Sequence, residues 1–164
     1  MMFCDDDEFL FPCADTTLPV ALAPYEKFAG LAVSWMLYGS SGHLTRPPGL
    51  VIANYPRRSV VPDHHVKCIV DPARMEGCEL IAHHFKCTRG EAIVDEAGEP
   101  MGGPFRDRPS ATVFRINHYL TQWNQIEDRT AERYIPRVNA HLASFYGGHS
   151  ARNWGPGSNS ALLI

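Results

Sequence analysis

Phe3-Cys4-Asp5-Asp6-Asp7-Glu8-Phe9-Leu10-Phe11-Pro12 is an acidic cluster between two apolar runs, and it decides how the fold is read. A strand over Met1–Cys4 is expected to end at this cluster. Asp5 and Asp7 are two positions apart, so at a strand end their side chains leave on the same face. Two convergent carboxylates make a hard oxygen site suited to Mg²⁺ or Mn²⁺. The other interpretation of the cluster is a solvated acidic turn.

Length and composition describe an ordinary globular chain. The chain has 164 residues, 45% of them hydrophobic and 20% charged, which is enough for one domain or part of one. Its net charge of −3 gives no indication of a basic nucleic-acid-binding surface. Its five cysteines form no Cys-x-x-Cys pair, which favours reduced thiols. No apolar run reaches transmembrane length, so we expect a cytoplasmic chain, or one held at a membrane through segments outside it.

Hydrophobic patterning predicts alternating strands and helices. The expected strands are 1–4, 31–38, 66–70, 81–87 and 112–116, with a hairpin over 91–101. The expected helices are 18–28, 50–55 and a long one over 126–145 that Pro136 breaks, followed by a loose tail. Between the strand 31–38 and the helix 50–55 lies a loop of small residues, 39–43.

Three further motifs follow the acidic cluster in a fixed order, the first of them in several pieces. They are Trp35-x-x-Tyr38-Gly39-Ser40-Ser41-Gly42-His43, then Pro48-Gly49-Leu50-Val51-Ile52 with Tyr55-Pro56-Arg57-Arg58, then His65-Val66-Lys67-Cys68-Ile69-Val70, and Arg115-Ile116-Asn117-His118-Tyr119-Leu120-Thr121. With this ordered set the chain resembles the family 92 and family 2-like glycosyltransferases. The resemblance implies an α/β fold, the C-terminal part of a GT-A nucleotide-sugar transferase fold with a mixed sheet and flanking helices. Residues 1–146 would be a partial GT-A domain and 147–164 a flexible tail.

The resemblance also implies a reaction and a metal. A sugar would pass from a UDP-sugar to the hydroxyl of a glycan or other acceptor, with inversion, in a reaction that depends on Mn²⁺ or Mg²⁺. Asp5 and Asp7 would hold the metal, and His118, at a strand end, would complete its ligand set. Nucleic acid is not expected among the partners, and no membrane segment is expected in this chain.

Residue type and motif position assign the remaining site residues. His43 is the candidate general base or acceptor contact, because the small loop that carries Ser40 and Ser41 lets a sugar come close. Lys67 and Arg58 are expected to contact phosphate as fixed positive charges. The identity of the base stays open.

Several departures from the family pattern favour a second interpretation. The nucleotide-binding half that would precede the Asp-x-Asp segment is absent, which would leave the sheet an unpaired edge and an uncovered apolar face. Ala53 stands where the family often has an acidic residue. The alternative is therefore a non-catalytic carbohydrate-binding or interaction module derived from a decayed transferase. A small His/Cys metal-binding protein is a weaker third option, and the doublets His64-His65 and His83-His84 are expected to be packing or surface residues.

Overall fold

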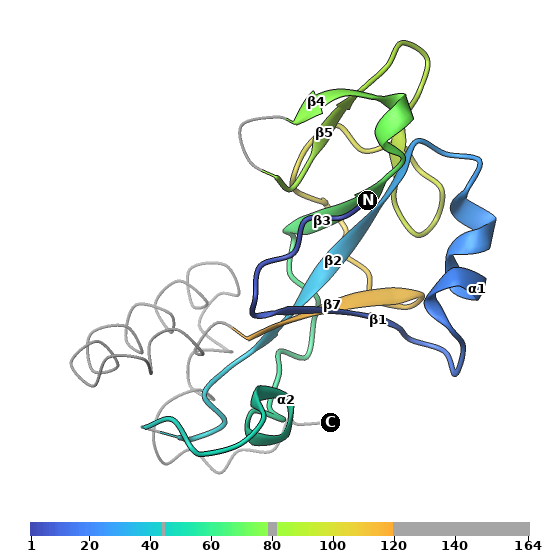
Figure 1. The fold of residues 1–164 in the computed structure, drawn as a ribbon. Helices are drawn as coiled ribbons and strands as arrows, with labels where there is room; N and C mark the ends of the chain where they lie inside the picture. The colour runs from blue at the N-terminus through green and yellow to red at the C-terminus, as the bar shows by residue number, and fades with distance from the viewer. Residues whose placement is uncertain (44, 79–81, 120–164) are drawn as a thin grey trace. The chain divides into compact units, whose positions relative to one another are not determined.

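The computed structural model describes residues 1–43, 45–78 and 82–119 (Figure 1). Their elements are, in chain order, β1 (Glu8–Pro12), α1 (Leu18–Leu22), η1 (Ala23–Tyr25), β2 (Gly30–Tyr38), α2 (Val51–Asn54), β3 (Val66–Val70), η2 (Pro72–Arg74), β4 (Met75–Cys78), β5 (Phe85–Cys87), β6 (Ile93–Val94) and β7 (Phe114–Tyr119). The chain divides into two compact units. The first holds Met1–Met36 and Pro62–Asn117; the described part of the second is Leu37–Val61 with His118 and Tyr119.

A mixed sheet organises these elements. Within the described residues it has five strands in the order β1-β7-β2-β3, with β6 also paired to β2. β2 runs antiparallel to β3 and parallel to β6. The hairpin β4-β5 forms a separate antiparallel pair. The expected α/β class with a mixed sheet is confirmed at this level.

The strand β2 is the centre of the sheet because its sequence is apolar without interruption. All nine of its residues are buried, as in a strand covered on both faces. Its register places Val33 opposite Lys67 and Ser34 opposite Val66. Gly30 permits this close pairing, since a Cβ there would lie 2.8 Å from the carbonyl oxygen of Ile69. The predicted strand over 31–38 is confirmed.

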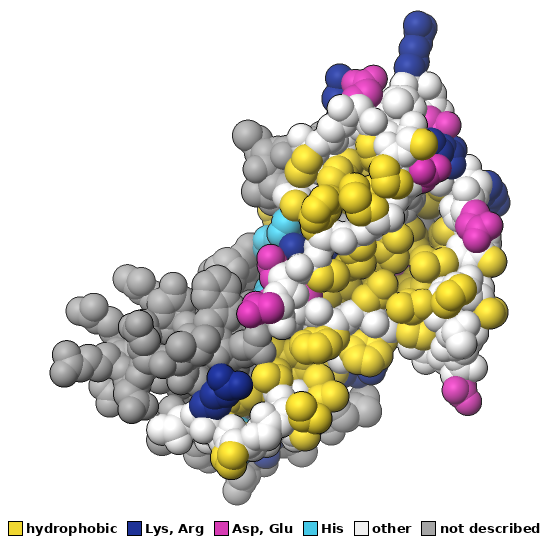
Figure 2. All heavy atoms as spheres, in the orientation of Figure 1, with side chains coloured by type: hydrophobic (Ala, Val, Ile, Leu, Met, Phe, Trp, Pro, Cys, Tyr) yellow, Lys and Arg dark blue, Asp and Glu magenta, His cyan; other side chains and the backbone are white. Residues whose placement is uncertain are grey.

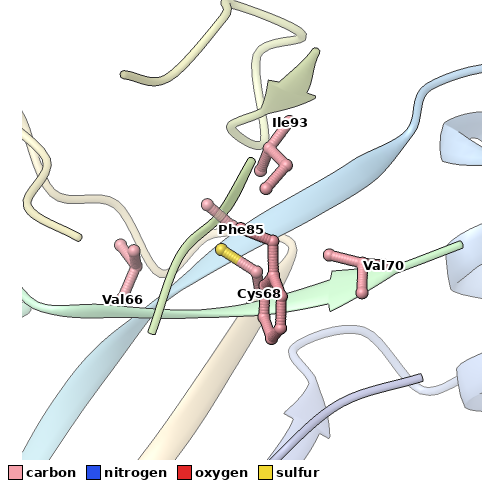
Figure 3. Packing of buried hydrophobic residues seen from close by; sticks show 6 residues of the cluster. Val66, Cys68, Val70, Phe85 and Ile93 are labelled. Atoms are coloured by element: carbon pink, nitrogen blue, oxygen red, sulfur yellow. The ribbon is translucent and has the colours of Figure 1, made fainter. Parts of the chain in front are cut away.

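The hydrophobic core of the first unit lies between β3 and the segments that follow it. Figure 3 shows side chains of β3 gathered with Phe85 and Ile93. The cluster consists of Ala32, Val66, Cys68, Val70, Phe85 and Ile93, with Met75, Cys87 and Met101 packed against it. Cys68 is a buried thiol whose Sγ donates to the carbonyl oxygen of His83 at 2.9 Å.

The hairpin around β6 positions the start of β7. Asp95 and Glu99 pair across a turn in which Gly98 has φ 84°, a conformation that favours glycine. The Glu96 carboxylate accepts hydrogen bonds from the backbone N–H groups of Thr112, Val113 and Phe114 at 3.2, 3.2 and 2.7 Å. It also accepts from the hydroxyls of Ser110 and Thr112. One side chain therefore fixes the entry into β7.

Three expectations differ from the structure. Residues 1–4 form no strand, because the backbone turns at Asp5 and the first strand starts only at Glu8. The helix predicted over 18–28 is α1 followed by the 3-10 turn η1, since Pro24 has no N–H to continue an α-helix. β4 was not predicted; its four residues, Met-Glu-Gly-Cys, carry little strand signal.

Other expectations are confirmed or fall outside the described residues. The strand over 66–70, the helical turn α2 and the hairpin over 91–101 are present, and the strand expected over 112–116 is β7, two to three residues later. The helix predicted over 126–145, the boundary at 146 and the tail lie outside the described residues. In the described part, the helices are all too short or too polar to cross a bilayer.

Candidate functional site

The acidic segment forms a turn directly before β1. The N–H of Asp5 donates to the Glu8 carboxylate at 3.0 Å, and the N–H of Glu8 donates to the carbonyl oxygen of Asp5 at 3.2 Å. The carboxylates of this turn differ in their exposure to solvent. Asp7 is 1% exposed and Glu8 is also buried, whereas the side chain of Asp5 is 64% exposed. A hard oxygen donor at the surface thus stands next to two buried ones.

Lys67 of β3 supplies the charge opposite this turn. Its side chain is 3% exposed, and its Nζ lies 3.0 Å from Asp5 Oδ2 and 3.3 Å from Glu8 Oε2. Burial alone lowers the pKa of Lys67, but the hydrogen bond to Asp5 and the charge of Glu8 outweigh burial and raise it above 10.5. Lys67 is therefore a fixed cation. The phosphate contact predicted for it stays a prediction, and here its partners are carboxylates.

Asp63 and His65 lie just before β3; the doublet His64-His65 was expected to be packing or surface residues, and no role was predicted for Asp63. Asp63 is buried, and its Oδ1 lies 2.6 Å from His65 Nδ1 and accepts from the His65 N–H at 2.8 Å. The His65 ring stacks on Trp35 with centroids 4.9 Å apart and 15° between planes. The carboxylate thus orients the imidazole, and the indole supports it.

Two further rings complete the cluster of Asp63, His65, Trp35, His83 and Phe105, which we call the imidazole cluster. Phe105 meets His65 edge-on at 4.7 Å, and His83 meets Trp35 edge-on at 5.1 Å. Burial lowers the pKa of His83, and the charges of Lys67 and His65 lower it further. The charge of Asp5 acts in the opposite direction and raises the pKa of His83. The imidazole cluster and the acidic turn therefore share one neighbourhood of the first unit. Figure 2 shows histidine and acidic side chains adjoining on this face.

The small-residue loop 39–43 belongs to the second unit, and the hydroxyls of its two serines help to hold it. Ser40 Oγ accepts from the N–H of Gly42, and Ser41 Oγ accepts from the N–H of Arg57 at 3.0 Å. Ser41 adopts φ 54°, a left-handed conformation that costs energy in a residue other than glycine. His43 Nε2 lies 3.1 Å from the carbonyl oxygen of Asn54.

Arg58 and His118 are the other predicted site residues of the second unit. Arg58 Nη1 donates to the carbonyl oxygen of Ser59, and the backbone of Arg58 bridges to Tyr38. His118 is buried in β7, the neighbour of β1 in the sheet. The three predicted metal ligands are divided between the two units, so their meeting at one cation stays a prediction. Among the side chains that the structure describes, no group of three or more His, Cys, Asp or Glu residues is placed to hold a metal.

The structure thus brings together some predicted residues and one unpredicted pair. Asp5 and Lys67 are joined, and Asp7 lies in the same turn. The Asp63–His65 pair was missed. Its signal is the spacing Asp63-His64-His65, since an aspartate often bonds the N–H two residues on and a histidine at that position brings its ring to the same carboxylate.

Comparison of the chain with protein-family models, with curated proteins and with solved structures finds no match.

Proposed function

We propose that the chain is the metal- and acceptor-binding part of a GT-A glycosyltransferase, which moves a sugar from a UDP-sugar to an acceptor hydroxyl with inversion and needs Mn²⁺ or Mg²⁺. Asp5 and Asp7 would hold the metal. The metal would neutralise the diphosphate of the leaving group. Ser40, Ser41 and His43 would face the sugar or the acceptor.

The acidic turn is the observation that supports this proposal. Its surface carboxylate, Asp5, stands beside the buried Asp7 and Glu8, and carboxylate oxygens are the donors that both cations prefer. The donor chemistry of this turn therefore suits such a metal, which would need further ligands, because no group of three or more His, Cys, Asp or Glu residues in the described part of the chain is placed to hold one. Lys67 supplies a permanent positive charge at the same turn, and a diphosphate requires positive charge there.

The test is calorimetric titration of UDP into the chain, with and without Mn²⁺. We expect UDP to bind only when Mn²⁺ is present. In the variant Asp5→Asn this binding should weaken by at least tenfold, because a carboxylate donor is lost. The matched control is Asp6→Asn, which removes the same charge from the exposed neighbouring position. Equal weakening in both variants would mean that net charge and not a ligand is responsible, and the proposal would fall.

One observation favours the second candidate, a non-catalytic carbohydrate-binding or interaction module. Lys67 already neutralises Asp5 and Glu8, as it would in a purely structural ion pair. A folded chain that shows no manganese-dependent UDP binding, but does bind free sugars, would support this candidate.

A further inference from the structure

We propose that the Asp63–His65 pair is the general base of the transfer, with His65 accepting the proton of the attacking hydroxyl and Asp63 positioning His65. This inference rests on the proposed function. It names the general base, whose identity the sequence analysis left open.

The position of Asp63 suits the orientation of a base. Its carboxylate is buried, and its Oδ1 contacts both the ring and the backbone N–H of His65, while its own N–H donates to the carbonyl oxygen of Trp35 at 2.8 Å. An ionised carboxylate can only accept hydrogen bonds, so Nδ1 of a neutral His65 carries the proton. The lone pair then lies on Nε2, and the carboxylate stabilises the imidazolium that forms after proton transfer.

The ring is held in place and still reaches the surface. Trp35 stacks on His65, and Phe105 contacts it edge-on. The side chain of His65 remains 20% exposed, and Phe105 is largely exposed beside it. An exposed phenyl ring next to a hydroxyl-binding base suits a sugar, whose C–H face packs on aromatic rings while its hydroxyl groups point sideways.

The charges around the pair support the same role. The groups that face this neighbourhood are Asp63, His83, Lys67 and Asp5. Burial keeps His83 neutral near pH 7, so it does not compete as a cation, whereas Lys67 is a fixed cation. The base therefore lies in the same neighbourhood as the acidic turn, where the diphosphate would be bound.

His43 is a weaker candidate for the base. Its Nε2 contacts a neutral carbonyl oxygen of Asn54, which supplies no charge to stabilise an imidazolium. Ala53, in the position where an acidic residue was expected, has no titratable group.

The acceptor oxygen forms a bond to the anomeric carbon of the UDP-sugar while its proton moves to His65 Nε2. The bond between the anomeric carbon and the phosphate oxygen breaks, and its electron pair leaves with UDP. The imidazolium later returns the proton to water.

The first experiment uses the full chain without substrate. Nitrogen-edited NMR of ¹⁵N-histidine-labelled protein reports which ring nitrogen of His65 carries the proton, and the variant His65→Gln assigns the signal. We expect the proton on Nδ1 in the wild type and loss of this preference in Asp63→Asn, since an amide can also donate. A wild-type proton on Nε2 overturns the proposal.

The second experiment measures transfer from UDP-hexoses to free hexoses with Mn²⁺. His65→Gln should lower kcat by about 10²- to 10⁴-fold and remove the acidic limb of the pH profile, without changing manganese-dependent UDP binding. The control His64→Gln alters the adjacent ring, whose Nδ1 lies 2.7 Å from the carbonyl oxygen of Arg106, and should keep kcat. Transfer by His65→Gln within twofold of wild type overturns the proposal, as does a wild type that binds UDP but transfers no sugar. A wild type that does not bind UDP counts against the proposed function instead. The tautomer measurement then still decides the role of the Asp63–His65 pair.

Discussion

Lys67 carries a buried charge that stabilises the fold and also lies at the candidate site. Its ammonium is almost fully buried and contacts two carboxylates, one buried and one exposed. A buried ion pair adds little net stability, but removing one partner leaves the other charge without compensation. Glu8 is the carboxylate that would be left in this state.

We predict that Lys67→Met lowers the free energy of unfolding by about 3 kcal/mol, the lower end of the range for broken buried pairs, because solvent screens Asp5. Urea unfolding measures the change. Lys86→Met is the matched control, since Lys86 forms an exposed pair with Glu76 and its loss should leave the unfolding midpoint nearly unchanged. Equal effects of the two substitutions would contradict a buried role for Lys67.

The stabilisation by Lys67 depends on pH. The pKa of Lys67 is higher in the folded chain than the ordinary 10.5, so its stabilising effect is complete below pH 10.5 and disappears as the pH rises through the folded value. The difference in stability between wild type and Lys67→Met should therefore shrink as the pH rises through the folded pKa of Lys67 in alkaline solution.

At the scale of elements, Glu96 ties the β6 hairpin to the entry of β7. Its two oxygens accept from three backbone N–H groups and two hydroxyl groups. Residues 110–113 belong to no helix or strand, so these bonds rather than a ladder hold them. Cys13 adds bonds to the carbonyl oxygens of Ala111 and Val113, but the Glu96 carboxylate makes most of the contacts that order this segment.

We predict that Glu96→Gln destabilises the chain by about 3 kcal/mol, because one acceptor oxygen becomes a donor that faces backbone N–H groups. Hydrogen exchange should speed up at Val113 and Phe114 first. Glu99→Gln removes an exposed carboxylate of the same turn and should leave the exchange rates as they are. Uniform acceleration across all strands would contradict a local role.

The fold was predictable where the pattern was strong. The unbroken apolar run of β2 and the β-branched residues of β3 predicted buried strands correctly. The start of the chain was predicted wrongly, because Phe3 looks like a strand residue and instead stacks on Phe85, a contact that sequence spacing does not reveal. The hairpin β4-β5 depends on pairing rather than propensity, so its first strand was missed.

The candidate site was predictable only in part. The acidic residues and Lys67 were chosen by type, and Lys67 does contact Asp5, although as its counter-ion. Asp63–His65 was missed because doublets of histidine carry no metal-ligand spacing. The His65 ring is also held by stacking on Trp35, which lies 30 positions earlier in the sequence, and sequence spacing does not reveal this contact.

At the scale of the whole molecule, large apolar side chains remain at the surface. Figure 2 shows apolar side chains over much of the described face. Those with the largest exposure in the first unit include Met1, Phe3, Phe11, Val20 and Phe105. β1, which carries Phe11, ends the strand order of the described sheet, and α1, which carries Val20, packs beside it. Apolar surface of this kind favours association.

We predict that the chain binds an apolar fluorescent dye in its folded state and associates as concentration rises. The double variant Phe11→Thr, Val20→Thr should reduce both effects with little loss of stability, because both side chains are exposed. Dye titration and sedimentation measure the change. Val60→Thr, at an exposed position of the second unit, is the control. Unchanged dye binding in the double variant would place the association surface elsewhere.

The five cysteines differ in burial, so their reactivity reports on opening of the core. Cys4, Cys13 and Cys78 lie at the surface, Cys87 is half-buried, and Cys68 sits in the core with its thiol bonded to a carbonyl oxygen. An alkylating reagent reaches the outer thiols directly but reaches Cys68 only when the core opens. The rate at which Cys68 is alkylated, compared with the outer thiols, therefore measures how often the core opens, and no label has to be introduced.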